Sequence, residues 1–262
     1  MIISLKGRKA IVGGASKGIG KAIAFAFAKA GAQVIMLARN EAVLKENLSE
    51  LKAINNVEHD YFVVDYSDAE ALKKTAQEIT EKHNNIDILV NNTGGPKAGP
   101  ANVAEVAEFL NTFNQHLIGN HIMMQAVKEG MKSANFGRII NIISTSVKQP
   151  IPGLGVSNTI RGAVANWSKT LSLELAPFGI TVNNVLPGAT ATQRLSEIIN
   201  NKADKKSVEI NEVEEEMINE IPARRFASPE ETANAVVFLA SEQAAYINGI
   251  NLPVDGGRTA CL

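Results

Sequence analysis

Short apolar runs alternate with longer segments of helical periodicity along nearly the whole chain, and this alternation constrains the fold most strongly. Residues 33–38, Gln-Val-Ile-Met-Leu-Ala, are an apolar run of strand length, whereas residues 41–54 place Val43, Leu44, Leu48 and Leu51 on one helical face. Apolar strands separated by helices are typical of a parallel sheet covered on both faces. The sequence therefore predicts an α/β fold, a doubly wound sheet of about seven strands.

The same periodicities predict where the elements lie. Strands are expected at 9–13, 33–38, 61–65, 86–92, 137–144, 180–186 and 249–254. Helices are expected at 18–30, 41–54 and 68–83, over a stretch that ends near residue 133, and at 155–176 and 229–241, with Ser67 as the N-cap of the third. No linker rich in proline, glycine or serine divides these segments, so a single domain over residues 1–262 is expected.

Composition excludes several classes of protein. With 45% hydrophobic and 20% charged residues the chain is not disordered, and a net charge of −1 gives no reason to expect nucleic acid as a partner. The single cysteine, Cys261, excludes an internal disulfide and a multi-thiolate metal site. No apolar run approaches the ~20 residues that span a bilayer, and the first residues do not resemble a signal peptide. We expect a cytoplasmic protein that does not bind a membrane.

One segment interrupts the alternation of strands and helices. Residues 192–220 hold a dense cluster of charged side chains that includes Lys202, Lys205, Lys206 and three successive glutamates at 214–216. Charge alone favours a solvated helical insertion. The alternative is a mobile substrate lid over residues 190–222, above a site at the carboxyl ends of the strands.

A glycine-rich loop joins the first predicted strand to the first predicted helix, since residues 13–20 read Gly-Gly-Ala-Ser-Lys-Gly-Ile-Gly. Gly14, Gly18 and Gly20 permit a tight turn and a close approach of the backbone to a pyrophosphate at the helix N-terminus. A glycine-rich loop alone is weak evidence, but the strand before it and the helix after it are the context that such a loop requires. The loop therefore predicts a Rossmann-type dinucleotide-binding domain.

The spacing Gly-x-x-x-Gly-x-Gly resembles that of the short-chain dehydrogenase/reductase family, and other motifs of this family follow in order. Asp65 follows the third strand, Asn91-Asn92-Thr93-Gly94 the fourth and Pro187-Gly188 the sixth, and residues 253–257 resemble the family's carboxyl-terminal tail. Within the family the chain resembles the 3-oxoacyl-[acyl-carrier-protein] reductases. Two positions depart from the family pattern: Gly13 stands where threonine is usual, and Thr93 where alanine is usual.

Charge at the end of the second strand predicts which cofactor binds. An acid there would repel the 2′-phosphate of NADP(H), but this chain has Ala38-Arg39-Asn40, with Lys17 in the glycine loop. Two cations favour the phosphate, so NADP(H) is expected rather than NAD(H), unless both are ordinary surface cations. The resemblance implies that the cofactor-binding residues are Gly14, Ser16, Lys17, Gly18, Ile19, Gly20, Arg39, Asp65, Asn91, Gly94, Arg161, Pro187, Gly188, Thr190 and Thr192.

The expected catalytic centre differs from that of the family. Members use an asparagine, a serine, a tyrosine that donates a proton and a lysine that lowers the tyrosine pKa. Ser144, at the end of the fifth predicted strand, matches the serine. The tyrosine and lysine positions hold Ser157 and Arg161, and the asparagine position holds His116. The tyrosines of the chain are elsewhere, at Tyr61, Tyr66 and Tyr246.

The replacements imply altered roles. Ser144 and Ser157 could orient a substrate oxygen, while Arg161 could hold the nicotinamide ribose and stabilise an alkoxide by its charge, although it cannot release a proton. His116 has the reference pKa for proton exchange near neutral pH and could feed a water that delivers the proton, but a helix histidine is more often structural. His121 does not share a helical face with His116, so no metal pair is expected.

Two functions remain open from the sequence. The first is an NADP(H)-dependent oxidoreductase that reduces a carbonyl or keto-acyl substrate, or oxidises the alcohol, with a non-standard proton donor. The second is an NADP(H)-binding protein of the same fold without dehydrogenase activity, a sensor or an assembly subunit. The resemblance also implies a homotetramer or homodimer, with the helix at 155–176 and the last strand at subunit interfaces. The sequence agrees, because Trp167 and the apolar residues around Leu171 exceed what one face of a monomer's core needs. The expected partner is a small-molecule substrate.

Overall fold

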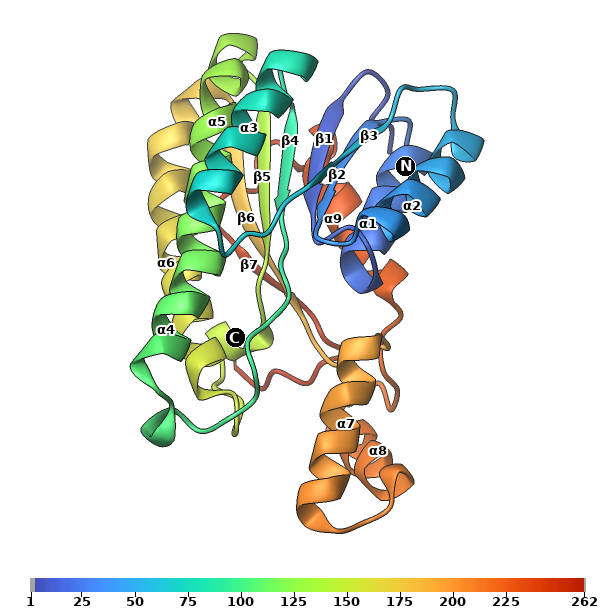
Figure 1. Cartoon of the computed structure of the whole chain (residues 1–262), viewed down its shortest axis with the longest axis vertical. Coiled ribbons are helices and arrows are strands. Elements are labelled where there is room, and N and C mark those ends of the chain that lie inside the picture. Colours follow the sequence, from blue (N-terminus) through green and yellow to red (C-terminus); the bar gives the residue numbers. More distant parts are fainter. Residues whose placement is uncertain (1–2, 262) are drawn as a thin grey trace.

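A seven-stranded parallel sheet forms the centre of the computed structural model, which describes residues 3–261 (Figure 1). The ends of the predicted domain, residues 1, 2 and 262, lie outside the described part. The strand order is β3-β2-β1-β4-β5-β6-β7. The strands are β1 (Lys9–Gly13), β2 (Gln33–Ala38), β3 (Asp60–Val63), β4 (Ile88–Asn91), β5 (Gly137–Ile142), β6 (Ile180–Pro187) and β7 (Asn251–Val254). The doubly wound single-domain fold predicted from the alternation is confirmed.

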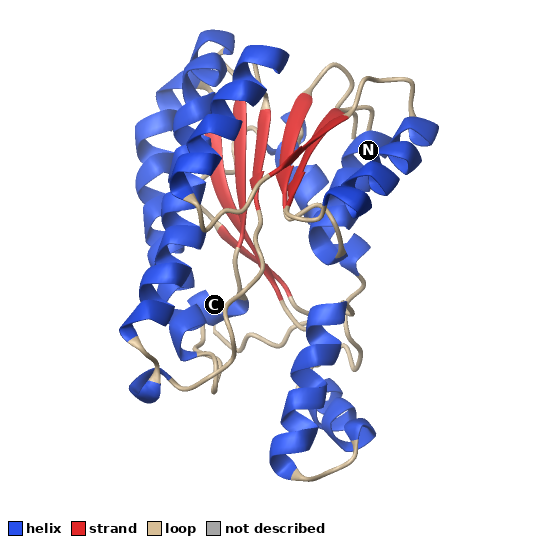
Figure 2. Cartoon of the chain, in the orientation of Figure 1, coloured by secondary structure: helices blue, strands red, loops and turns tan. Residues whose placement is uncertain are grey.

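Helices cover both faces of this sheet (Figure 2). One face carries α1 (Gly18–Lys29), α2 (Glu41–Ile54) and α9 (Pro229–Ala240). The other carries α3 (Ala69–His83), α4 (Val106–Phe113), α5 (Gly119–Ala134) and α6 (Gly155–Leu175). The chain runs outward from β1 to β3 and then returns to β4 beside β1, so the strand order reverses between β1 and β4. Ligands of open α/β sheets bind at the carboxyl ends of the strands at such a reversal.

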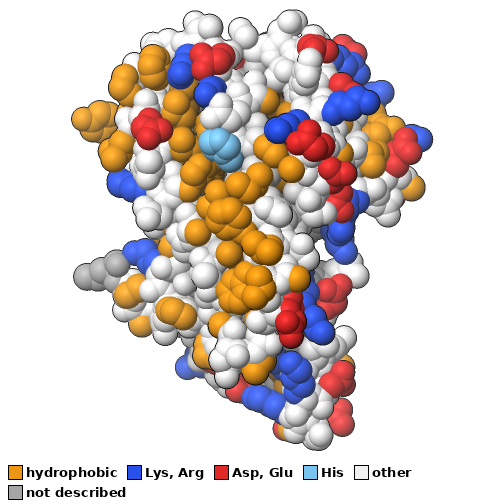
Figure 3. Space-filling model, turned by 60° about the vertical axis from the view of Figure 1, so that its left-hand side comes forward, with side chains coloured by type: hydrophobic (Ala, Val, Ile, Leu, Met, Phe, Trp, Pro, Cys, Tyr) orange, Lys and Arg blue, Asp and Glu red, His pale blue; other side chains and the backbone are white. Residues whose placement is uncertain are grey.

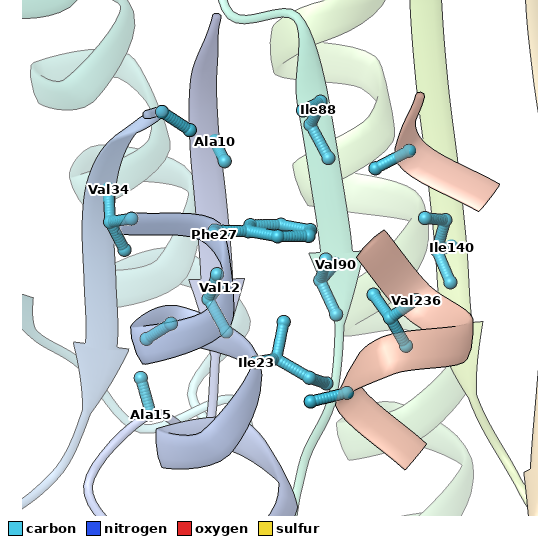
Figure 4. Close-up of a cluster of buried hydrophobic side chains, with 14 of the residues drawn as sticks. Ala10, Val12, Ala15, Ile23, Phe27, Val34, Ile88, Val90, Ile140 and Val236 are labelled. Carbon is cyan, nitrogen blue, oxygen red and sulfur yellow. The ribbon is translucent and has the colours of Figure 1, made fainter. Parts of the chain in front are cut away.

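The core between the sheet and the helices explains the apolar periodicity of the sequence. Phe27 of α1 is fully buried against strand residues such as Val12 and Val90, and Val236 of α9 packs into the same cluster (Figure 4). A second cluster fills the opposite face and includes Leu171 of α6, while Trp167 is partly buried against it. The expectation that residues around Leu171 exceed the needs of a monomer's core is therefore wrong for Leu171 itself, which is buried within this chain.

Some element boundaries differ from the predicted ones. Asp68, not Ser67, is the N-cap of α3, because its carboxylate accepts a hydrogen bond from the Ala71 N–H. The Ser67 side chain instead donates to Asp65. The helical stretch that ends near residue 133 is two helices joined by a π-helical turn over Asn114–Ile118. Such a turn adds a residue to the helix and often marks a functional position.

The charged segment after β6 folds into two helices, α7 (Gln193–Lys206) and α8 (Ile210–Asn219), which project from the carboxyl end of the sheet (Figure 1). They have a small core of their own, formed by Leu195, Ile199, Ala203, Val213 and Met217. The charged residues of this segment are exposed, except for Glu214, which is half-buried. The segment is helical, as both interpretations of its sequence require.

Four asparagines form a ladder across neighbouring strands near the carboxyl end of the sheet. Asn91, Asn141, Asn184 and Asn251 stand opposite one another in the registers of β4, β5, β6 and β7. Each side-chain amide donates to the next oxygen toward β7, at 2.8, 3.0 and 2.8 Å. Asn141 also donates to the Ser168 hydroxyl of α6 at 2.8 Å. The ladder joins β4, β5, β6 and β7 in one register, and it lies at or next to the last residue of β4 and β5.

We predict that Asn141→Ala lowers the free energy of unfolding by about 3 kcal/mol, because it leaves the buried Asn91 amide N–H without its acceptor and the buried Asn184 side-chain oxygen without its donor. Asn251→Ala is the matched control at the end of the ladder. Its position is partly exposed, so water replaces the lost bond and the loss is about 1 kcal/mol or less. Denaturant unfolding measures both. Equal losses for the two variants would contradict a cooperative ladder.

Candidate active site

The glycine loop turns tightly between β1 and α1. Gly14 and Gly18 adopt φ angles of +59° and +57°, in the left-handed region. A β-carbon at Gly20 would lie 2.1 Å from the Gly14 carbonyl oxygen, so only glycine fits there. Gly18, Ile19 and Gly20 form the first turn of α1, and Lys17 precedes it without a side-chain cap. The amides of this turn are therefore free to bind an anion.

Asn47 of α2 supports the same loop, a role that the sequence did not suggest. It is fully buried, and its amide donates to the carbonyl oxygens of Ala15 and Ser16, both at 3.1 Å. Asparagine inside a helix gives no sequence signal of such a contact, because the loop is about 30 residues away in the chain. Asn47 thus holds the loop through two of its carbonyl oxygens.

The two predicted cofactor cations lie on the surface beside this loop. Arg39, after β2, is 76% exposed and forms an ion pair with Asp65 at 3.6 Å. Partial burial raises the pKa of Asp65, but the N–H and hydroxyl of Ser67 and the charge of Arg39 outweigh it and leave the pKa below its ordinary value. Lys17 donates to the Gln193 side chain of α7 at 2.7 Å. Neither cation is buried or committed to a strong partner.

The loop after β4 lies on the other side of the strand-order reversal. The Asn91 side chain is buried in the asparagine ladder, so only its backbone can face the cleft. Asn92 donates to the Gly13 carbonyl at 3.0 Å and ties this loop to β1. A β-carbon at Gly94 would meet no atom within 4 Å, so open space adjoins it.

Arg161 is the most unusual residue of the site. The residue is 8% exposed, and its Nη1 donates to the Ile142 carbonyl at the end of β5 at 2.9 Å. No carboxylate among residues 3–261 pairs with it, and burial lowers its pKa to about 10. A β-carbon at Gly95 would lie 3.9 Å from Nη2, so this cation reaches the loop after β4. It is a buried positive charge without a counter-charge.

Two serines lie near this charge in the chain. Ser144 follows β5, and its Oγ accepts a hydrogen bond from the Ser146 N–H at 3.1 Å. Ser157 is on the first turn of α6, four residues before Arg161 and thus on the same side of the helix. The Asn158 side chain donates to the Ile151 carbonyl at 2.9 Å and holds the loop that precedes α6.

His116 lies in the π-helical turn and packs toward α6. It is 1% exposed, its Nδ1 is 2.6 Å from the Thr93 hydroxyl oxygen, and its Nε2 has no hydrogen-bond partner among the described residues. Burial and the positive charge of Arg161 hold the pKa of His116 well below its ordinary value, although the Gly94 carbonyl opposes them. The imidazole is therefore neutral at neutral pH.

The loop after β6 lies at the same carboxyl end of the sheet. Pro187 ends the strand, the Gly188 N–H donates to Val254 of β7, and the Thr190 hydroxyl donates to Gly188. Thr192 is the N-cap of α7, and a β-carbon at Gly18 would lie 3.3 Å from its methyl group. Its neighbour Arg194 donates to the Pro96 carbonyl at 2.8 Å, a contact missing from the sequence-based predictions. The first turn of α7 thus contacts both the glycine loop and the loop after β4.

A cavity of about 160 Å³ opens beside the first turn of α6, lined in part by Lys97, Val103, Glu108 and Val156. Backbone hydrogen bonds of Gly99 to Gly153 and Gly155 join the two loops that border it, at 2.7 and 2.9 Å.

Other classes of site have no support in residues 3–261. No helix there has the length and apolarity of a membrane span. No three or more His, Cys, Asp or Glu side chains in the same range lie together so as to hold a metal ion.

Comparisons with known proteins identify the family to which the chain belongs. A family model described as enoyl-(acyl carrier protein) reductase matches residues 14–259. The chain belongs to the short-chain dehydrogenase/reductase family. The NADPH-dependent reductase BacG of Bacillus subtilis (strain 168) is 34% identical over 255 residues, which cover 95% of this chain and 97% of BacG.

Two further similarities extend over nearly the full length. The 3-oxoacyl-[acyl-carrier-protein] reductase FabG of Vibrio harveyi is 34% identical over 260 residues, 97% of this chain and 98% of FabG. The structure of L-sorbose reductase from Gluconobacter frateurii, complexed with NADPH and L-sorbose, superposes with a TM-score of 0.94 at 30% identity and covers 100% of both chains.

Gly13 stands where threonine is usual in the family, and the structure gives a steric reason for this difference. A β-carbon there would lie 2.7 Å from the Asn92 carbonyl oxygen and 2.8 Å from the Tyr66 hydroxyl. Tyr66 is buried, and its hydroxyl has no hydrogen-bond partner among the described residues, so burial raises its pKa. The tyrosine thus fills the volume that a side chain at position 13 would need.

We predict that Gly13→Ala destabilises the protein by about 2 kcal/mol through overpacking. Tyr66→Phe should instead stabilise it by about 1 kcal/mol, because it removes an unpaired buried hydroxyl. In the Tyr66→Phe background Gly13→Ala should cost less, since one of its two close contacts is gone. Thermal unfolding of the four proteins measures this coupling. If the effects of Gly13→Ala and Tyr66→Phe on stability simply add in the double variant, the contact between position 13 and Tyr66 is contradicted.

Proposed function

We propose that this chain reduces the carbonyl group of a small or keto-acyl substrate, or oxidises the corresponding alcohol, without the tyrosine–lysine pair of its family. The chain is an oxidoreductase, and its cofactor is NADP(H). One observation carries the proposal: a buried and unpaired guanidinium, Arg161, stands at the carboxyl end of β5 where the family pattern places lysine. Such a fixed charge can stabilise an alkoxide that has not yet been protonated.

The glycine loop and its surroundings fit a phosphorylated dinucleotide. The free amides of the first turn of α1 would hold the pyrophosphate, and Lys17 and Arg39 the 2′-phosphate. The exposed ion pair of Arg39 with Asp65 is weak, so Arg39 turns toward a phosphate at little cost. The naming of BacG as NADPH-dependent and the NADPH in the L-sorbose reductase complex support this choice. When bound, NADPH supplies a hydride.

Reduction of a carbonyl also needs one proton at the oxygen. The Ser157 hydroxyl is a much weaker acid than a phenol, and a guanidinium keeps its protons. We assign orientation of the oxygen to Ser144 and Ser157, and stabilisation of its negative charge to Arg161. The proton then comes from a water beside His116, and the hydroxide that remains is neutralised by solvent.

We also propose that α7 and α8 form a substrate lid within residues 190–222. The contacts of Lys17 with Gln193 and of Arg194 with Pro96 join the first turn of α7 to both sides of the cleft. Both contacts are exposed single hydrogen bonds, which break and re-form readily.

A homotetramer or homodimer is the assembly we propose. Apolar side chains gather on the face that carries α4, α5 and α6 (Figure 3). The exposed ones include Val103, Val106 and Leu110 near α4 and Leu173 of α6. Light scattering that gives a monomer would contradict this proposal.

We predict that Arg39→Ala raises the dissociation constant for NADPH about tenfold or more, because a charge-assisted contact to the 2′-phosphate is lost. The dissociation constant for NADH should stay within about twofold, since NADH lacks this phosphate. Lys52→Ala, an exposed cation farther along α2, is the control. Calorimetric titration measures all three proteins, and an equal effect on both cofactors would contradict the assignment.

We predict that Arg161→Met lowers kcat about 10²-fold or more, as loss of a charge that stabilises an oxyanion does. The same change should leave the melting temperature equal or higher, because it replaces an uncompensated buried charge by an apolar side chain of similar length. Arg161→Lys should retain part of the activity. The assay follows NADPH oxidation with ketones, β-keto thioesters, quinones and aldehydes. Absence of turnover by the unchanged protein with every substrate would overturn the proposed function.

A further inference from the structure

Thr93 and His116 are joined by the shortest polar contact near the candidate site. The Thr93 hydroxyl oxygen and Nδ1 of His116 are 2.6 Å apart, although the residues are 23 positions apart in the chain. Thr93 stands where the family pattern has alanine, and His116 where it has asparagine. These two departures from the family pattern are in direct contact. The proposed function gives Thr93 no role.

The charge of this histidine follows from its surroundings. Arg161 of α6 faces it with a positive charge, while Thr93 and Gly94 face it from the loop after β4 with neutral groups. The ring is almost fully buried. A second positive charge so close to Arg161 is unfavourable, so His116 carries one proton on its ring, on either Nδ1 or Nε2.

The hydroxyl of Thr93 selects between these two positions. Among residues 3–261 this hydroxyl has no other acceptor within hydrogen-bond distance, whereas the lone pair of Nδ1 is 2.6 Å away. If the hydroxyl donates to Nδ1, both groups are satisfied and the ring proton lies on Nε2. In the opposite tautomer Nδ1 would donate to the hydroxyl oxygen, and the hydroxyl proton would then need a water as its partner.

This arrangement leaves one buried donor without a partner. Nε2 has no acceptor among the described residues, and the ring geometry turns it away from Thr93. A buried N–H without a partner costs free energy. The Nε2–H group therefore favours the binding of an oxygen that can accept its hydrogen bond. The neighbouring Arg161 would attract the same oxygen if it carries negative charge.

We propose that Thr93 is a positioning residue that holds His116 in the neutral tautomer with its proton on Nε2, so that His116 donates a hydrogen bond to the oxygen of a water or of the substrate. The role of this bond in turnover rests on the proposed function. The tautomer does not, because it follows from contacts within this chain. His116 acts here as a fixed neutral donor and not as an imidazolium acid.

The tautomer is tested by nitrogen NMR of the full-length protein with ¹⁵N-labelled histidine. His116→Asn identifies the signals of His116, and His59, His83 and His121 serve as internal references. We expect a neutral ring protonated on Nε2, a change toward the other tautomer in Thr93→Val, and the original signals in Thr93→Ser. A proton on Nδ1 in the unchanged protein, or the same tautomer in Thr93→Val, would overturn the proposal.

Turnover provides the second readout. Thr93→Val should lower kcat about tenfold, the effect of one hydrogen bond, with the dissociation constant for NADPH unchanged. Thr93→Ser should restore kcat to within about twofold. An unchanged kcat in Thr93→Val overturns the role of the contact alone, whereas no turnover by the unchanged protein overturns the proposed function and leaves the NMR result to decide the tautomer.

Discussion

A buried guanidinium without a counter-charge is the constraint around which this site is arranged. Arg161 donates a hydrogen bond to the Ile142 carbonyl, and within residues 3–261 no carboxylate pairs with it. Taking a charge out of water costs several kcal/mol unless dipoles or an opposite charge compensate it. Burial and this charge together keep His116 neutral, the Ile142 carbonyl accepts a hydrogen bond from the guanidinium, and Gly95 lies close to it. A group that develops negative charge there is stabilised without moving any side chain.

The asparagine ladder and the glycine loop place this charge beside a cofactor site. The ladder joins β4, β5, β6 and β7 side by side in one register. The turn at Gly14 and Gly20 brings the start of α1 to the same edge. The first turn of α1 and a fixed positive charge thus lie along one edge of one sheet. Rigid elements hold reacting groups more accurately than loops do.

Much of the fold could be predicted from the sequence, because burial on both faces leaves continuous apolar strands such as Gln33–Ala38. The N-cap of α3 was misplaced since Ser67 and Asp68 are both capable caps, and only the backbone geometry distinguishes them. The break between α4 and α5 was missed because a π-helical turn keeps the apolar pattern nearly intact. Leu171 was placed at an interface because periodicity alone does not say which apolar face meets the sheet.

The candidate site, like the fold, could be predicted from the sequence only in part. The spacing of the motifs identified Ser144, Ser157 and Arg161 as candidates. Ser157 and Arg161 lie on the same side of α6 because they are four residues apart. It could not show that Arg161 is buried without a partner, or that Thr93 touches His116, because both depend on how distant segments pack. Asn47 and Arg194 were missed for the same reason.

The claim that a fixed charge replaces an ionisable acid is tested most directly by the pH dependence of hydride transfer. The measurement is the rate of deuterium transfer from deuterated NADPH to a carbonyl substrate between pH 6 and 9, followed in the product by mass spectrometry. With Arg161 charged up to a pKa of about 10 and His116 neutral, the account predicts a constant rate across this range. A rate that falls as the pH rises through an apparent pKa within the range would reveal a titrating acid and contradict the account.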